Sequence, residues 1–167
     1  MLVYQMDVRD RFRAIGGQMG EMGMGGEMGM HGGMAFTNTF LIPDISKAII
    51  GEAHAYWFYE RLAELAPNEQ NRQTILRIQR DEAKHYRWFT MILSHLGGQQ
   101  PQIPTGKMPM TFQEGVRTAI HDELETAAFY QDIAYRATDR PIEMHFMHAM
   151  HDEQRHASLF QLMYSGL

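Results

Sequence analysis

The stretches DEAKHYRWF (residues 81–89) and DEQRHASLF (residues 152–160) decide how this chain is expected to fold. An offset of 71 residues relates them and places Glu82 on Glu153 and His85 on His156. In each copy the glutamate and the histidine are three residues apart, so on a helix both side chains lie on one face. Each stretch is therefore predicted to be helical and to present one carboxylate and one imidazole to the same ion.

The same offset relates an earlier pair of segments. AIIGEAHAYWFYERLA (residues 48–63) matches AIHDELETAAFYQDIA (residues 119–134), which pairs Glu52 with Glu123 and Tyr59 with Tyr130. An internal duplication of one helical hairpin explains both matches. A duplicated hairpin predicts a site with pseudo-twofold symmetry at the centre of the molecule.

Apolar periodicity and stop signals divide the chain after residue 43 into four helices. Asp44 is expected to cap the first turn of the first helix, and Thr111 and Glu114 have the spacing of a capping box at the start of the third. Pro67 ends the first helix and the glycines after Leu96 end the second. We expect helices at about 44–66, 68–96, 111–138 and 139–166.

The connections predict the topology. The first and second helices, and likewise the third and fourth, are joined by only a few residues, so each pair forms an antiparallel hairpin. Between the hairpins lies GGQQPQIPTGKMPM (residues 97–110), whose three prolines favour extended chain. Such a segment reaches roughly 45 Å, whereas a twenty-residue helix is about 30 Å long. The expected fold is an all-α four-helix bundle with one long crossover.

Six side chains are predicted to be metal ligands in the middle of this bundle. Glu52 and Glu82 lie about equally far from the turn between their helices, and Glu123 and Glu153 flank the second turn in the same way, so all four reach one level. Four carboxylates with two neutral imidazoles nearly neutralise two divalent cations, and their hard oxygen atoms tolerate the trivalent state. Without metal, four buried carboxylates would be very costly. The predicted ligands are Glu52, Glu82, His85, Glu123, Glu153 and His156.

Through these residues the chain resembles the ferritin-like superfamily, especially its rubrerythrin and bacterioferritin branches, over residues 44 to 165. The resemblance implies two iron ions, or alternatively two manganese ions, as cofactors. Rubrerythrins add a cysteine-ligated rubredoxin centre, which this chain cannot form because it has no cysteine. They also carry an extra glutamate one turn along the third helix, where this sequence has Thr126. Bacterioferritins share the symmetric ligand set but form cages with haem.

The resemblance implies a non-haem dimetal oxidoreductase, and the first expectation is a rubrerythrin-like peroxidase. Its oxidant is hydrogen peroxide, or alternatively dioxygen, and its electrons come from an external donor. The alternatives are a ferroxidase that passes iron to a store, an assembly or coat protein with a vestigial site, and a hydroxylase. Tyr59 and Tyr130 are the candidate catalytic residues beside the metals, with a purely structural core role as the alternative. Asp81 and Asp152, one turn before His85 and His156, are candidates to orient the imidazoles.

The amino-acid composition indicates how many domains the chain has and where its tail ends. The chain has 167 residues, of which 44% are hydrophobic, enough for one compact domain. Residues 16–34 are almost entirely glycine and methionine, so we expect a flexible tail at 1–40 and the bundle at 41–167. A tail rich in thioethers can bind copper(I), scavenge oxidants or dock on a partner.

Charge and hydropathy limit the partners. The formal net charge is −5 at pH 7, and no basic face predicts binding to nucleic acid or to an anionic membrane. No basic leader or apolar run of membrane-spanning length occurs in the sequence. We therefore expect a cytoplasmic protein that binds neither nucleic acid nor membrane. We also expect that it assembles as a homo-oligomer, specifically a dimer.

Overall fold

The computed structural model describes residues 38–166 of the protein. The glycine- and methionine-rich part of the predicted tail lies outside these residues. A short 3-10 helix η1 (Thr39–Leu41) runs directly into the first of four long helices. No strand occurs between residues 38 and 166. The four helices are α2 (Ile42–Glu64), α3 (Glu69–His95), α4 (Phe112–Arg136) and α5 (Arg140–Ser165).

Side-chain caps explain where two of these helices, α3 and α4, begin. The Oδ1 atom of Asn68 accepts a hydrogen bond of 2.8 Å from the backbone N–H of Asn71, at the start of α3. The Oγ1 atom of Thr111 accepts one of 3.2 Å from the backbone N–H of Glu114, which confirms the predicted cap of α4. The predicted cap at Asp44 is wrong. Because η1 leads into α2 in a helical conformation, α2 already begins at Ile42, and Asp44 in its first turn instead accepts from Arg136 Nη2 at 2.7 Å.

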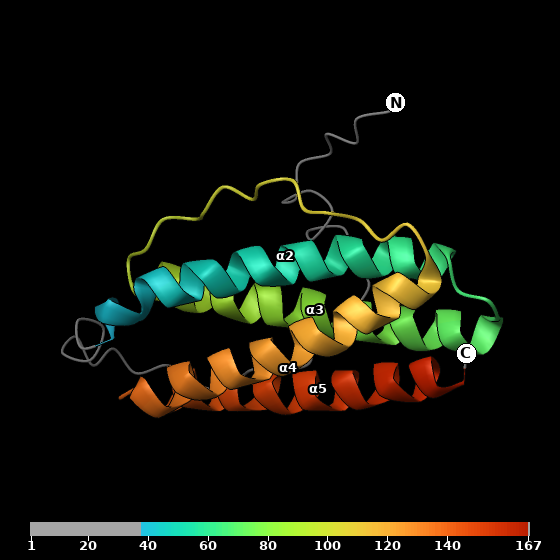
Figure 1. Ribbon diagram of the computed structural model, residues 1–167. Coiled ribbons are helices and arrows are strands. Elements are labelled where there is room, and N and C mark those ends of the chain that lie inside the picture. The colour runs from blue at the N-terminus through green and yellow to red at the C-terminus, as the bar shows by residue number, and fades with distance from the viewer. Residues whose placement is uncertain (1–37, 167) are drawn as a thin grey trace, which may run out of the picture. The chain divides into compact units, whose positions relative to one another are not determined.

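The chain forms two antiparallel hairpins, α2 with α3 and α4 with α5, and one long crossover joins them (Figure 1). Gly97, with a φ of 77°, adopts the left-handed conformation that ends α3, and the N–H of Gly98 donates to the carbonyl of Leu93 at 2.9 Å. The extended residues that follow run alongside α2, where His54 Nε2 donates to the carbonyl of Pro104 at 2.6 Å. The predicted four-helix bundle with a single crossover is confirmed.

Aromatic side chains fill the bundle on both sides of its middle. On one side the rings of Phe89 and Phe146 stack with centroids 4.2 Å apart, and Tyr130 packs edge-on against them. On the other side Tyr59 packs on Phe160 with centroids 5.1 Å apart. Tyr59 and Phe160 are the repeat equivalents of Tyr130 and Phe89, so two related aromatic layers enclose the space between them.

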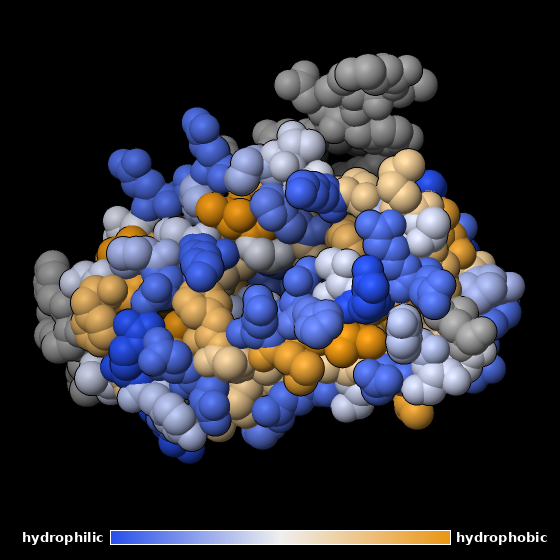
Figure 2. Space-filling model, in the orientation of Figure 1, coloured by the Kyte–Doolittle hydropathy of each residue, from blue (hydrophilic) through white to orange (hydrophobic). Residues whose placement is uncertain are grey.

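The outside of the bundle is mixed in character. Figure 2 shows hydrophilic residues intermingled with apolar ones on the face seen in Figure 1. None of the helices between residues 38 and 166 is long and apolar enough to cross a membrane.

Asn38, just before η1, is fully buried, and its Oδ1 accepts a hydrogen bond from the backbone N–H of Thr138 at 2.9 Å. Asn38 thus ties the start of α2 to the turn between α4 and α5.

Candidate metal centre

The structure brings all six predicted ligand side chains together between the two aromatic layers. Each of them is buried, with at most 3% of its surface exposed. Their ligand atoms form two groups, and within each group these atoms lie within 4.8 Å of one another. Glu82 and Glu153 belong to both groups, and each group adds one glutamate and one histidine. The first group is Glu52, Glu82, His85 and Glu153, and the second is Glu82, Glu123, Glu153 and His156.

Distances show that the two groups interlock across the bundle. His85 Nδ1 lies 3.1 Å from Glu153 Oε1 on α5 and 3.6 Å from Glu52 Oε1 on α2. His156 Nδ1 lies 3.1 Å from Glu82 Oε1 on α3 and, in the same way, 3.6 Å from Glu123 Oε1 on α4. Each hairpin therefore contributes its Glu-x-x-His glutamate to the histidine of the other hairpin.

The cluster contains polar atoms that no protein group satisfies. Glu52 Oε2, Glu82 Oε1, His85 Nδ1 and Glu153 Oε1 are buried and form no well-aligned hydrogen bond, although His85 Nδ1 and Glu153 Oε1 lie only 3.1 Å apart. A buried polar atom without a partner costs about 1–3 kcal/mol, and more when it is charged. Two cations among these oxygen and nitrogen atoms would satisfy all four at once. The donor set therefore fits a dimetal site of the carboxylate and histidine type.

The metal-free cluster divides its charge unevenly. Burial raises the pKa of Glu52 well above its ordinary value, although the nearby His85 opposes the shift. Burial and the neighbouring Glu153 raise the pKa of Glu123 in the same way. Burial also disfavours charge on Glu82, but the neighbouring His156 outweighs it and lowers the pKa of that carboxyl. Without metal, Glu52 and Glu123 thus bind protons more readily than ordinary glutamates, and an arriving cation competes with those protons.

Asp81 and Asp152 orient the two imidazoles in a crossed arrangement. Along the sequence, each aspartate lies one turn before the histidine of its own helix, but in the fold each pairs with the other histidine. His85 Nε2 of α3 lies 3.1 Å from Asp152 Oδ2 of α5, and His156 Nε2 of α5 lies 3.3 Å from Asp81 Oδ2 of α3. Because each ring presents Nε2 to an aspartate, its Nδ1 faces the carboxylate cluster.

Two cations that were not predicted from the sequence, Lys84 and Arg155, hold these aspartates. Lys84 Nζ donates to Asp81 at 2.9 Å and to Asp152 at 2.8 Å, and Arg155 Nη2 donates to Asp81 at 3.0 Å and to Asp152 at 2.6 Å. Lys84 and Arg155 are equivalent positions of the internal repeat, and this matching of cations was the signal that could have revealed them. The two cations and the two aspartates form one ion-pair network on the α3–α5 side of the cluster.

The two predicted tyrosines contact the cluster from its α2–α4 side. The Tyr59 hydroxyl donates to Glu123 Oε1 at 2.6 Å, and the Tyr130 hydroxyl donates to Glu52 Oε1. Burial and the adjacent carboxylates raise the pKa of both phenols well above their ordinary value, so both remain protonated donors at neutral pH. Each tyrosine therefore hydrogen-bonds to a glutamate that belongs to only one of the two groups, and this glutamate lies in the other half of the internal repeat.

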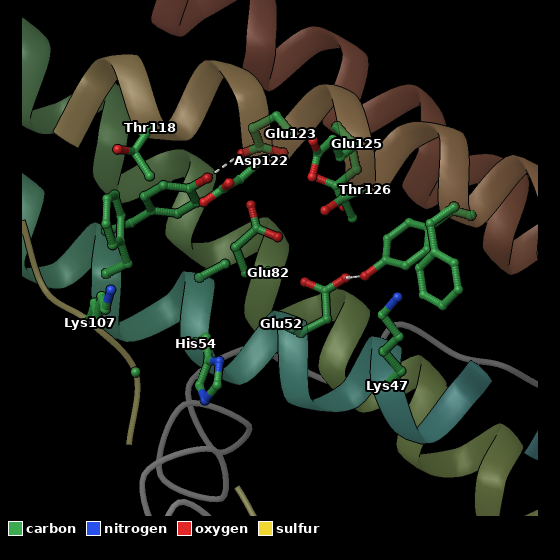
Figure 3. A pocket seen from close by; sticks show the side chains of 18 residues that line it. Lys47, Glu52, His54, Glu82, Lys107, Thr118, Asp122, Glu123, Glu125 and Thr126 are labelled. Carbon is green, nitrogen blue, oxygen red and sulfur yellow. Dashed lines mark hydrogen bonds between the residues drawn. The ribbon is translucent and has the colours of Figure 1, made fainter. Parts of the chain in front are cut away.

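A cavity of about 510 Å³ opens onto the cluster between α2, α4 and the crossover (Figure 3). The carboxylates of Glu52, Glu82 and Glu123 point into it, and Thr126 of α4 lies on its wall. Small molecules therefore have a route to the buried carboxylates from this side. The sequence predicted the ligands at the floor of this cavity but not the cavity itself.

The bundle, its crossover and the buried carboxylate–histidine cluster place this chain among the ferritin-like dimetal carboxylate proteins. The model of the rubrerythrin family matches residues 45–164, and the chain belongs to that family. It is 37% identical over 121 residues to YhjR of Bacillus subtilis (strain 168), described as an uncharacterized protein, across 72% of this chain and 83% of YhjR.

Two solved structures share the fold. A ferritin-like, diiron-carboxylate protein from Bacillus anthracis str. Ames aligns with a TM-score of 0.70 and 19% identity, covering 77% of this chain and 97% of that one. A hypothetical protein from Pyrococcus furiosus aligns with a TM-score of 0.66 and 19% identity, covering 75% of this chain and 88% of that one. At this identity the likeness is one of fold.

Proposed function

We propose that this protein is a rubrerythrin-type peroxidase that reduces hydrogen peroxide to water at two iron ions, with electrons from an external donor. The observation that carries the proposal is the pair of buried groups that share Glu82 and Glu153, in a chain of the rubrerythrin family. Two bound iron ions would supply the two electrons that convert one peroxide and two protons into two waters. Manganese is the alternative metal for the same ligands.

The residues around the centre have separate roles in this proposal. Glu82 and Glu153 contact both groups, Glu52 and Glu123 belong to one group each, and the two histidines complete the set. Tyr59 and Tyr130 fix Glu123 and Glu52 by hydrogen bonds, and we propose that the same two phenols assist the reaction by donating hydrogen bonds or electrons. The crossed aspartates keep Nδ1 of each imidazole directed at the cluster.

The charge of the cluster supports the proposal. Four carboxylates and two neutral imidazoles offset the charge of two divalent cations, and the cations compete with the protons that burial favours on Glu52 and Glu123. The cavity above the cluster admits peroxide from the α2–α4 side. We further propose that the protein works as a cytoplasmic homodimer that binds neither nucleic acid nor membrane.

The test compares two oxidants. The reduced di-iron protein is mixed in a stopped-flow instrument with hydrogen peroxide and, separately, with dioxygen. We expect faster oxidation by peroxide, with water as the product and no large iron cores. The double variant Glu82→Gln/His85→Gln is the matched control, because it removes ligands from both groups and should react with neither oxidant.

The opposite result would identify the main alternative. Rapid oxidation by dioxygen alone, followed by deposition of many irons per chain, would overturn the peroxidase proposal and establish an iron-storing ferroxidase. A purified protein that holds no tightly bound metal and consumes no peroxide would instead favour an assembly role with a vestigial site.

A further inference from the structure

The predicted ligands are enclosed so completely that an electron-donating protein cannot touch them. Each of the six side chains has at most 3% of its surface exposed. The cavity on the α2–α4 side encloses about 510 Å³, the size of a pocket for a small molecule and far too small for a protein. On the α3–α5 side, the ion-pair network of Lys84 and Arg155 covers the cluster. An electron from a carrier protein therefore has to pass through side chains of the bundle.

Trp88 of α3 connects the outside of the bundle with one of the ligands. Its side chain is partly exposed, and its ring centroid lies 5.6 Å from that of His85, with 36° between the two planes. Because His85 directs Nδ1 at the carboxylate cluster, a single imidazole separates the indole from the predicted metal position. In the second half of the internal repeat this position is Leu159, so the repeat itself does not require an aromatic side chain here.

Neighbouring side chains hold the indole ring in place. The Lys84 ammonium lies 5.2 Å from the centroid of the ring, within the range of a cation–π contact. The His145 ring of α5 packs edge-on against Trp88 with centroids 5.0 Å apart, and His145 Nδ1 donates to the carbonyl of Pro141 at 2.6 Å. Side chains of both α3 and α5 thus fix the indole beside His85.

The surface around Trp88 has the character of a small docking patch. Met91, one turn beyond Trp88 on α3, is 56% exposed, and Met144, next to His145 on α5, is 44% exposed. The His148 ring lies edge-on to the indole with centroids 6.4 Å apart. Electron-transfer proteins dock through small interfaces, usually below about 1,200 Å² in total. A few apolar side chains around one aromatic ring are enough for such an encounter.

The charges beside this patch favour an acidic partner. Arg80 is exposed one turn before Lys84, and Arg87 is partly exposed next to Trp88. Within residues 38–166 neither arginine forms an ion pair. The adjoining ion-pair network is neutral because it contains two cations and two aspartates. The two arginines therefore leave a positive charge beside the patch, although the whole chain has a formal net charge of −5.

We propose that electrons reach the dimetal centre through Trp88, from an acidic one-electron carrier protein of the iron–sulfur type that docks over Met91 and Met144. The inference rests on the proposed function, which requires an external donor but assigns it no route. In each transfer the iron–sulfur group of the carrier loses one electron, which passes through the indole and His85 to the oxidised centre, and no bond of Trp88 forms or breaks. Two transfers replace the two electrons that one peroxide consumes. Because this route uses the α3–α5 side, the carrier does not compete with peroxide for the cavity.

The experiment compares a protein donor with a small one. The full-length di-iron protein is oxidised with ferricyanide, and its reduction by reduced plant-type [2Fe–2S] ferredoxin or by dithionite is followed in a stopped-flow instrument. Dithionite acts through the sulfur dioxide radical anion, which is small enough to enter the cavity. Trp88→Leu, which copies Leu159, should slow reduction by ferredoxin about tenfold, or about 1.4 kcal/mol of barrier. Reduction of the same variant by dithionite should be unchanged.

Two further variants separate the electron route from a structural effect. Trp57→Leu is the matched control, because Trp57 is a partly exposed tryptophan of α2 whose ring lies beside His54. Trp88→Phe keeps an aromatic ring and should retain most of the ferredoxin rate. Metal content and the midpoint potential of the centre should be unchanged in all three variants. Equal ferredoxin rates in Trp88→Leu and Trp57→Leu, or equal slowing with both reductants, would overturn the inference.

Docking is measured separately, without metal and without electron transfer. Isothermal titration calorimetry of the full-length metal-free protein gives the Kd for oxidised ferredoxin. Arg87→Glu leaves Trp88 and the ligands in place and should weaken binding about fivefold. Arg117→Glu is the control, because Arg117 is exposed on α4. Equal weakening by the two substitutions, or no saturable binding to the unaltered protein, would overturn the docking surface.

The use of ferricyanide keeps this test independent of peroxide. Reduction by ferredoxin that depends on Trp88, in a protein that peroxide does not oxidise, would refute the proposed function and leave this route standing. Rapid oxidation by peroxide together with ferredoxin rates that do not depend on Trp88 would do the reverse.

Discussion

The sharing of Glu82 and Glu153 predicts that the four glutamates are not equivalent in metal binding. Glu82 lies 3.1 Å from His156 Nδ1 in one group and 3.7 Å from His85 Nδ1 in the other, so Glu82→Gln removes a carboxylate charge from both. Glu52 belongs to one group, so Glu52→Gln should affect only one ion. The two substitutions make the same chemical change at the same depth in the bundle.

The size of the effect follows from the charge that is removed. A unit charge about 4 Å from a cation is worth about 4 kcal/mol per unit of cation charge at an effective dielectric constant of 20. For divalent iron the loss is about 8 kcal/mol, or roughly a millionfold in affinity, as an upper value because the amide oxygen remains a ligand. At a free iron(II) concentration that just saturates the unaltered protein, Glu82→Gln should retain fewer than one ion per chain. Glu52→Gln should retain about one, because the second group is intact.

Anaerobic equilibrium dialysis against buffered iron(II), followed by metal analysis, measures both stoichiometries. Circular dichroism confirms that each variant is folded. Glu64→Gln, which removes only an exposed ion pair with Arg61, is the control and should keep two ions. Two full equivalents in Glu82→Gln, or equal losses in Glu82→Gln and Glu52→Gln, would refute the shared arrangement.

Four further outcomes are expected. Glu153→Gln/His156→Gln, like Glu82→Gln/His85→Gln, should lower the metal content below two ions per chain, and two full equivalents in either double variant would contradict a site shared by both hairpins. In the metal-free protein, burial opposes ionisation of Asp81, but hydrogen bonds from His156 and Lys84 outweigh it and lower its pKa from 3.8 to about 2. The resulting stability, about 2 kcal/mol, is complete above pH 4 and is lost as the pH falls toward 2, so urea unfolding of Asp81→Asn should show a weaker loss over that interval. Thr126→Glu, which restores the glutamate of rubrerythrins, should speed peroxide consumption, and an unchanged stopped-flow rate would show that this carboxylate is dispensable here. A chain starting at Ala35 should stay helical and metal-loaded, whereas loss of its circular dichroism signal would show that residues 1–34 are needed for folding.

The sequence alone was sufficient for the features that depend on spacing along one helix. Glu82 and His85 are three residues apart, so any helical conformation places them on one face, whatever packs against it. The 71-residue repeat then supplied the second half of the cluster, and the prolines between residues 97 and 110 required the long crossover. The helix ends deviated by a few residues because caps depend on local backbone conformation, as η1 shows at Asp44.

The tertiary structure decided every feature that depends on how one helix faces another. Helical periodicity fixes the direction of Asp81 relative to Glu82, but only the packing of α3 against α5 brings it to His156 and not to His85. The same packing determined that Glu82 and Glu153 are the shared carboxylates. The cavity also required the fold, because α2, α4 and the crossover each contribute a side that no single segment of sequence contains.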